Sequence, residues 1–395
     1  MVRKALGAAV TLATLLAFAA QAGADIVYWG NQSPNRISFA ALDGSSSGDL
    51  NTSGAVVTTP DGTALDPAHG RIYWANGNGK ISFANLDGSG GGGTLNTAGA
   101  TITDPVGLAL DPIAGRVYWA NEEDDFNAIG YANLDGSGGG NLNTAGATLD
   151  VPTGVAVDPA AGLIYWTNDS PSRAGVSFAR LNGSGGGDLT LFSSTGSATG
   201  AVAVDPLNQR AWWTNQKGSK VEFIGLNGSG RGSLTTSATV ASPIGLALDP
   251  GAQRVYWANA STLANTIAFA NFDGSSPGSV NAGTATVSVP VFPVLLKPPV
   301  GTGPPSVGGG STAKSKLTCS GAGWAGDLSP AHLYQAPQNF AYAWTRNGRR
   351  VKGAKTDTLR ADGAGRYRCA VTASNQAGST TQTSQALTVP RRHRH

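Results

Sequence analysis

The sequence predicts an all-β protein: a six-bladed β-propeller followed by a small β-sandwich. The first observation is a Tyr-Trp or Trp-Trp pair that occurs six times, at intervals of 45, 45, 47, 47 and 44 residues. The second is that short strand-like runs separate these pairs, and a period of this size built from short strands is typical of a propeller with one blade per repeat. The pairs are Tyr28-Trp29, Tyr73-Trp74, Tyr118-Trp119, Tyr165-Trp166, Trp212-Trp213 and Tyr256-Trp257.

Each repeat contains four predicted strands in the same order. In the third repeat, an apolar run at 107–110 is followed by Asp-Pro, the aromatic strand at 116–121, a strand at 129–134, an Asp-Gly turn and a short strand at 141–144. The first strand is rich in Gly and Ala, so we expect it beside the propeller axis, where large side chains would clash. The Asp-Gly and Asn-Gly pairs predict hairpins that need a positive φ.

The first repeat lacks its own inner strand, because the mature chain begins directly at an aromatic strand near Asp25. The segment 285–296 looks like a worn copy of 238–248, which precedes the aromatic strand of the sixth repeat. We therefore expect residues 289–297 to supply the missing strand, so that the two ends of the propeller share one sheet and leave no exposed edge.

The Tyr-Trp-x-Asn strands and the Asn-Leu-Asp-Gly-Ser segments at 85–89 and 133–137 resemble the YWTD repeats of low-density-lipoprotein-receptor propellers. The resemblance covers about residues 25–298 and implies six blades. The family's Asp is replaced here by an Asn, which loses the charge but keeps a hydrogen-bonding side chain. These residues are Asn31, Asn76, Asn121, Asn168, Asn215 and Asn259. No cysteine-rich modules flank the repeats, so receptor function is not carried over.

Residues 1–24 have the features of a secretory signal peptide: Arg3 and Lys4, an apolar core and a small-residue cleavage site. We expect the mature chain to begin near Asp25 outside the cytoplasm, with no later transmembrane segment. The charge is divided unevenly. Residues 25–298 hold 12 Lys/Arg and 21 Asp/Glu, net −9, whereas 299–395 hold 13 Lys/Arg and 3 Asp, net +10. A basic C-terminal domain is attracted to anionic surfaces, although simple solubility or docking on the acidic propeller explains it equally well.

The C-terminal part is predicted to contain a Pro- and Gly-rich linker at 299–311, a domain at 312–390 and a short basic tail at 391–395. Cys319, Trp344, and Tyr367 two residues before Cys369 resemble the immunoglobulin-like pattern, which implies a Cys319–Cys369 disulfide between two sheets and a tyrosine corner. The stretch 324–339 is longer than this pattern requires. It is interpreted as a bulged loop, as a plain insertion, or as a segment that carries His332 and Tyr334 to a ligand.

No catalytic set is evident, since the histidines are only at positions 69, 332, 393 and 395 and no three of them could meet at a metal. The most unusual loop follows the third aromatic strand and contains Glu122, Glu123, Asp124, Asp125 and Phe126. Four adjacent acids repel one another unless a cation or a basic partner is near. These five residues are the ligand-binding candidates; calcium is the candidate cation because it prefers oxygen ligands, although a solvated acidic loop is the simpler interpretation.

The leading hypothesis is a secreted, non-catalytic recognition protein, whose propeller loops bind an extracellular protein or glycan. The immunoglobulin-like domain would act as a spacer or as a tether to an anionic cell-envelope polymer, and no specific nucleic acid is expected. The alternative is a propeller hydrolase or lyase with a metal near the central channel. A purely structural envelope component is a third hypothesis.

Overall fold

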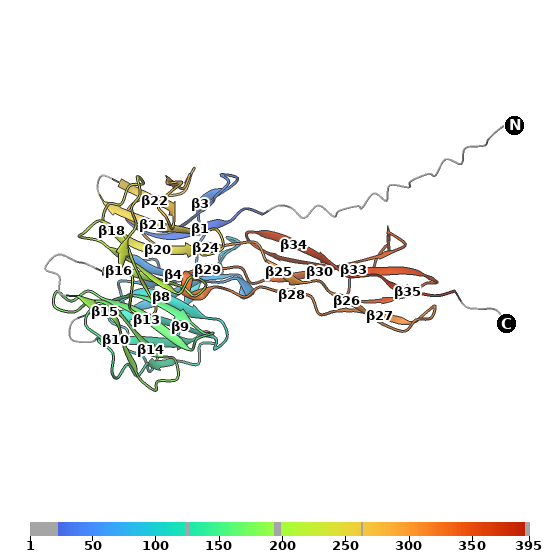
Figure 1. Cartoon of the computed structure of the whole chain (residues 1–395), viewed down its shortest axis with the longest axis horizontal. Coiled ribbons are helices and arrows are strands. Elements are labelled where there is room, and N and C mark those ends of the chain that lie inside the picture. The colour runs from blue at the N-terminus through green and yellow to red at the C-terminus, as the bar shows by residue number, and fades with distance from the viewer. Residues whose placement is uncertain (1–22, 124–126, 193–198, 262–263, 392–395) are drawn as a thin grey trace.

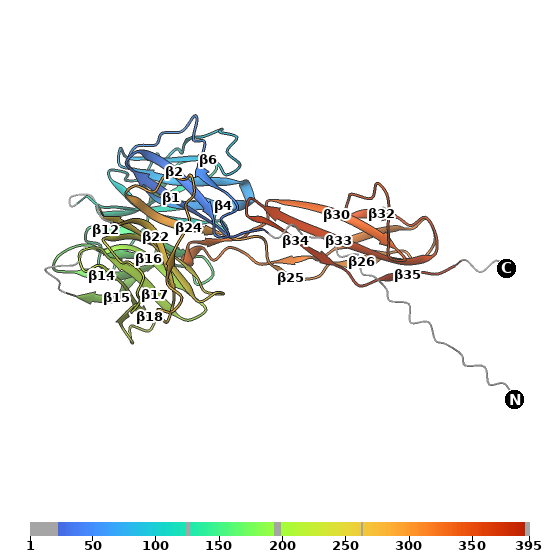
Figure 2. The same ribbon diagram turned by 90° about the horizontal axis from the view of Figure 1, so that it is seen from above.

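The computed structural model describes residues 23–123, 127–192, 199–261 and 264–391. It is all-β, as predicted, with a ring of four-stranded antiparallel sheets and an elongated C-terminal β region that extends to one side of the ring (Figure 1). Turning the molecule by 90° shows the same two parts, with the C-terminal region leaving the ring near its centre (Figure 2).

Five blades are built from four consecutive strands each, ordered here from the inner to the outer edge. Blade 2 contains β4 (Pro60–Asp66), β5 (Arg71–Asn76), β6 (Lys80–Asn85) and β7 (Gly93–Thr94). Blade 3 contains β8 (Pro105–Asp111), β9 (Arg116–Asn121), β10 (Ala128–Asn133) and β11 (Gly139–Asn141). Blade 4 contains β12 (Pro152–Asp158), β13 (Leu163–Asn168), β14 (Ala174–Arg180) and β15 (Gly186–Phe192). Blade 5 contains β16 (Thr199–Asp205), β17 (Arg210–Asn215), β18 (Lys220–Gly225) and β19 (Gly232–Ser233). Blade 6 contains β20 (Pro243–Asp249), β21 (Arg254–Ser261), β22 (Ala264–Asn271) and β23 (Gly278–Ser279).

Blade 1 joins the two ends of the propeller, which confirms the predicted closure. Its inner strand is β24 (Pro290–Leu296), which pairs antiparallel with β1 (Ile26–Gln32). The strands β2 (Asn35–Ala41) and β3 (Ser47–Asp49) complete the blade. The expected donor segment, 289–297, contains the observed strand, so the edge of β1 is covered by the far end of the propeller.

The six inner strands contact one another in a closed cycle: β4, β8, β12, β16, β20, β24 and back to β4. They approach so closely that a methyl group on Gly107 would lie 2.5 Å from the Thr153 carbonyl oxygen, and one on Gly154 would lie 2.5 Å from Ala201 Cα. Between blades 1 and 2 the Thr63 hydroxyl donates to the Phe292 carbonyl oxygen at 2.6 Å. The small residues of the inner strands are therefore required by backbone packing around the axis.

The repeated aromatic pairs are buried, and each member has its own role. The first aromatic packs on the aromatic residue of the next strand, as in Tyr73 on Phe83 with centroids 5.7 Å apart. The second is a Trp, and in blades 2, 3, 4 and 6 its indole N–H donates to a carbonyl oxygen 18 residues upstream, for example Trp74 to Val56 at 2.9 Å. In blade 1 that acceptor is Thr286, far downstream, because the strand that precedes β1 in space comes from the C-terminal end of the propeller.

In the C-terminal region a disulfide joins the two larger sheets. One sheet contains β26 (Ser306–Gly309), β27 (Lys316–Ser320) and β32 (Thr358–Arg360). The other contains β31 (Arg349–Arg350), β30 (Asn339–Arg346), β33 (Gly365–Asn375) and β34 (Gly378–Thr383), with β35 (Leu387–Val389) paired to β33. Cys319 in β27 is bonded to Cys369 in β33, so the bond joins the two sheets.

Two further features complete the predicted immunoglobulin-like sandwich. Trp344 is fully buried in the same apolar cluster as both cysteines. The Tyr367 hydroxyl donates to the Gly363 carbonyl oxygen at 2.8 Å, four residues upstream, which is the geometry of a tyrosine corner.

The segment expected to be a linker differs from that expectation, because it contains strands. β25 (Gly301–Gly303) pairs with β28 (Gly323–Trp324), and β26 pairs with β27. Both partners belong to the C-terminal region. Backbone pairing therefore overrides the local preference of a Gly- and Pro-rich sequence for a flexible chain, and the sandwich begins before residue 312.

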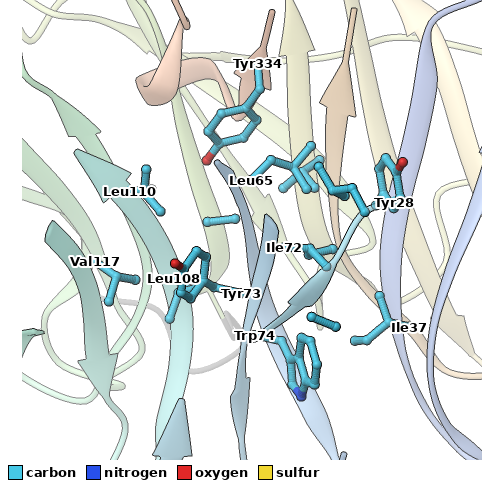
Figure 3. Packing of buried hydrophobic residues seen from close by; sticks show 14 of the residues in the cluster. Tyr28, Ile37, Leu65, Ile72, Tyr73, Trp74, Leu108, Leu110, Val117 and Tyr334 are labelled. Carbon is cyan, nitrogen blue, oxygen red and sulfur yellow. The ribbon is translucent and has the colours of Figure 1, made fainter. Parts of the chain in front are cut away.

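The long stretch at 324–339 leaves the sandwich and packs into the propeller. It contains a short 3-10 helix, η2 (Ser329–Ala331), and a strand, β29 (Leu333–Tyr334), which pairs parallel with β24 at the inner edge of blade 1. We call residues 325–338 the insertion. Figure 3 shows Tyr334 reaching down among the apolar side chains of the propeller, above Leu65 and near Leu110. The insertion is thus part of the propeller's own core.

Candidate functional site

The propeller has two faces with different contents. The inner strands begin on one face, together with the loops that join the aromatic strands to the third strands; we call this the loop face. They end on the other face at the Asp-Pro turns, which we call the turn face. Each Asp caps its own turn, as Asp111 does by accepting the Ile113 and Ala114 backbone N–H groups at 2.9 Å. The loop face therefore holds the segments that differ most between blades.

Carboxylates from blades 2 and 3 gather on the loop face. Asp61, in β4, accepts a hydrogen bond from the Gln32 side-chain amide at 2.9 Å. Burial, together with the negative charges of Glu122 and Asp104, raises the pKa of Asp61 to about 8. Burial and the charge of Glu123 raise the pKa of Asp104. We call Asp61, Asp104, Glu122 and Glu123 the acidic group.

Sequence reasoning found only half of this group. Glu122 and Glu123 were ligand-binding candidates, whereas Asp124, Asp125 and Phe126 lie outside the described residues. Asp61 and Asp104 were not singled out. A signal for Asp61 was present, since the second inner-strand position is apolar, Thr or Gly in the other blades. Asp61 is the one acid at this position of the inner strands, and it departs from the pattern of the other blades.

The described residues contain no group of three His, Cys, Asp or Glu side chains arranged to hold a metal ion. Because Asp124 and Asp125 fall outside that set, calcium binding by the acidic loop stays a prediction. The hydrolase or lyase hypothesis stays a hypothesis for the same reason, and within the described chain no observation favours it.

On the turn face, the insertion packs against the inner strands around the propeller axis. The 3-10 helix η2 contacts the inner strands of blades 3, 4, 5 and 6, and β29 contacts β20 and β24. His332 and Tyr334 lie in the stretch that the sequence allows to be a bulged loop, a plain insertion or a ligand-carrying segment. Both residues are buried there. The sequence offered no sign that the binding surface for this stretch would be the propeller itself.

The sandwich carries uncompensated positive charge. Residues 314–368 contain ten Lys/Arg and three Asp. Two like-charged pairs stand directly opposite each other on adjacent strands: Lys316 faces Arg360, and Arg346 faces Arg349. Arg346 is balanced by Asp362 at 2.8 Å. Like charges in directly opposed positions destabilise a sheet, so the Lys316–Arg360 pair is retained at a cost to the fold.

Comparison with known proteins shows the propeller fold. The structure of a nidogen/laminin complex contains a chain similar to this one, with a TM-score of 0.56 and 15% sequence identity, over 69% of this chain and 98% of that chain. Hydrazine synthase from Kuenenia stuttgartiensis has a TM-score of 0.49 at 16% identity over 62% of this chain and 73% of its own. A TolB protein from Agrobacterium tumefaciens has 0.46 at 11% identity over 66% and 89%.

At these identities the likeness to the nidogen chain shows the fold alone. No protein-family model matches the sequence, and neither does any curated protein. Across the described part of the chain, no helix has the length and apolar character needed to cross a membrane. The Cys319–Cys369 bond is compatible with an exported protein, because disulfides persist in oxidising compartments.

Proposed function

We propose that this chain is a secreted, non-catalytic recognition protein whose loop face binds an extracellular protein or glycan ligand. The observation that carries the proposal is the contrast between the two faces of the propeller. On the turn face, the chain's own insertion packs against the inner strands, whereas the loop face presents the acidic group.

The acidic group favours a basic protein ligand over a neutral glycan. A Lys or Arg side chain placed near Asp61 would return the carboxyl to its charged form and offset the repulsion from Asp104 and Glu122. The nidogen propeller comes from a structure described as a complex with laminin, which supports protein recognition as a use of this fold. Fold alone does not specify the ligand.

A displayed peptide library selected against the full-length protein tests this proposal. Selected peptides should be rich in Lys and Arg, and Asp61→Asn with Glu122→Gln should weaken their binding at least tenfold. The matched control is Asp43→Asn, an exposed acid in a turn of blade 1 that should leave binding unchanged. Equal binding by wild type and by the double variant would contradict the assignment of the acidic group.

The immunoglobulin-like domain is proposed to tether the molecule to an anionic envelope polymer. Its net charge of +10 over residues 299–395 supports electrostatic binding, and such binding weakens as salt rises. The full-length protein should elute from a heparin column at higher salt than a Lys316→Glu, Arg366→Glu variant. A variant that elutes at the same salt would remove the support for a tether.

A further inference from the structure

The insertion makes backbone hydrogen bonds to the propeller as well as side-chain contacts. The Leu295 N–H donates to the His332 carbonyl oxygen at 2.9 Å, and the Lys297 N–H donates to the Tyr334 carbonyl oxygen at 2.8 Å. The insertion is thereby an added strand on the inner edge of blade 1, a common mode of peptide recognition.

Side chains of the insertion are embedded in the apolar clusters of the propeller. Leu333 and Ala331 belong to the cluster around Trp257, and Tyr334 belongs to the cluster around Trp74. Ala377, from the β33–β34 turn of the sandwich, is also a member of the second cluster. The sandwich is therefore held by two of its segments, the insertion and the β33–β34 turn, besides its covalent connection.

His332 lies at the centre of this contact. Its Nε2 is 2.9 Å from the Val202 carbonyl oxygen in β16, so Nε2 carries the proton and donates it. The other ring nitrogen, Nδ1, is buried and has no hydrogen-bond partner among the described residues. Protonating Nδ1 would place a positive charge there without an acceptor, a costly arrangement.

The charged groups around His332 do not offset such a charge. The strands that η2 contacts end in Asp111, Asp158, Asp205 and Asp249, and these carboxylates accept N–H groups of their own turns. Asp249 also binds Lys297 at 2.6 Å, and Lys297 binds Asp25 at 3.1 Å. Within the insertion, Asp327 accepts the backbone N–H groups of Gln335 and Ala336 at 2.6 and 2.8 Å. On blade 2, Asp66 pairs with His69 at 2.7 Å.

We propose that the insertion is a latch, a peptide ligand carried by the chain itself, which fixes the sandwich on the turn face and which protonation of His332 loosens. The latch sets the basic domain and the acidic loop face in one fixed arrangement, on opposite sides of the propeller. This inference is independent of the ligand proposed for the loop face, since it concerns only contacts within the chain.

The direction of the pH effect follows from two buried groups. Burial lowers the pKa of His332 below its ordinary value, so as pH falls below about 6.5 the undocked form binds up to one proton more and acid favours release. Burial raises the pKa of Asp327 to about 6. The docked form therefore retains a proton on Asp327 between about pH 4 and 6, which opposes release. Comparing two proteins that differ only at position 332 cancels the contribution of Asp327.

Hydrogen–deuterium exchange of the full-length protein tests the latch. The Leu295 and Lys297 amides should be strongly protected at pH 7.5. Their opening equilibrium, corrected for intrinsic exchange, should rise by up to tenfold per pH unit below about 6.5, which is the limit for one proton. In His332→Gln, which keeps a donor for Val202 but does not titrate, this rise should be lost. His69→Gln, which alters an exposed histidine on the same face, should behave as wild type.

Two results would overturn the proposal. Rapid exchange of both amides in wild type at pH 7.5, with the blades still protected, would mean that the insertion is not docked. Identical pH dependence in wild type and His332→Gln would mean that the histidine does not control it. If His332→Gln does not fold, Asp327→Ala gives a second test: it removes the acceptor that shapes the insertion, leaves every propeller residue in place, and should raise the opening equilibrium of the two amides at pH 7.5.

Discussion

The Asn two residues after the aromatic pair is explained, in five of the six blades, by its hydrogen bonds. Asn121 is fully buried; its Oδ1 accepts the Thr103 backbone N–H, and its Nδ2 donates to the carbonyl oxygens of Thr101 and Ala128. A carboxylate has no donor for the two carbonyl groups. The neutral amide therefore links the aromatic strand both to the preceding connection and to the next strand. The same pattern of acceptance occurs at Asn31, Asn76, Asn168 and Asn259.

We expect Asn121→Asp to lower the free energy of unfolding by at least about 3 kcal/mol at pH 7, because it buries a charge against two carbonyl oxygens. The pKa of the new carboxyl would be raised in the folded protein. The loss should then shrink as pH falls toward about 4, where the folded form can take up the proton. Urea unfolding at both pH values measures this. Asn96→Asp, at an exposed Asn, is the control and should cost less than about 1 kcal/mol.

The same reasoning applies to the like-charged pair in the sandwich. Lys316→Glu would place opposite charges on facing positions of β27 and β32. It should stabilise the domain by about 0.2–1 kcal/mol while lowering the salt needed to elute the protein from heparin. A rise in stability together with weaker heparin binding would indicate that the Lys316 charge serves a partner. A fall in both quantities would indicate that Lys316 contributes to the stability of the fold.

At the scale of elements, the inner strands depend on glycine for a reason that the sequence pattern only suggested. Their backbones contact the next inner strand directly, so a side chain at these positions meets main-chain atoms that cannot move aside. Apart from β15, the outer strands are only two or three residues long, and side chains near them fasten each blade to the next, as when Asn143, just after β11, donates to the Gly183 carbonyl oxygen at 3.0 Å. Blade order is thus specified at both the inner and outer edges of the ring.

Gly154→Ala should destabilise the propeller by several kcal/mol, because the added methyl group would lie 2.5 Å from Ala201 Cα. Gly308→Ala is the matched control, since β26 has open space around this glycine and its φ is ordinary. There the substitution should be neutral or stabilise by up to about 1 kcal/mol. Thermal unfolding of both variants compares the two sites, and similar losses would argue against close packing of the inner strands.

At the scale of the whole molecule, the ring closes through β24 and the sandwich is fastened by the insertion. Both connections join residues far apart in the sequence, and both use the inner edge of blade 1. The stability of the propeller should therefore depend on segments that follow it.

A chain ending at residue 288 should fail to form a stable propeller, because β1 and blades 2 and 6 would lose the strand that closes the ring. Expression with limited proteolysis measures this, and a protease-resistant product would contradict it.

Reduction of the Cys319–Cys369 bond is a separate test of the sandwich. The two cysteines are 50 residues apart, so reduction should lower the free energy of unfolding of the sandwich by about 4 kcal/mol in the loop-entropy treatment. The unfolding transition of the blades should change less.

The sequence by itself determined the number of blades, the order of strands, the identity of the closing strand and the disulfide. These follow from local pattern: a period, an alternation of small and aromatic residues, and spacings between Cys, Trp and Tyr. The tertiary structure decided three other matters. It made the expected linker into strands, brought Asp61 and Asp104 beside Glu122, and buried His332 and Tyr334 among the inner strands of the propeller. Each of these depends on contacts between segments from different repeats or domains, whose partners are chosen by shape and burial in three dimensions. A pattern along one chain segment does not contain that information.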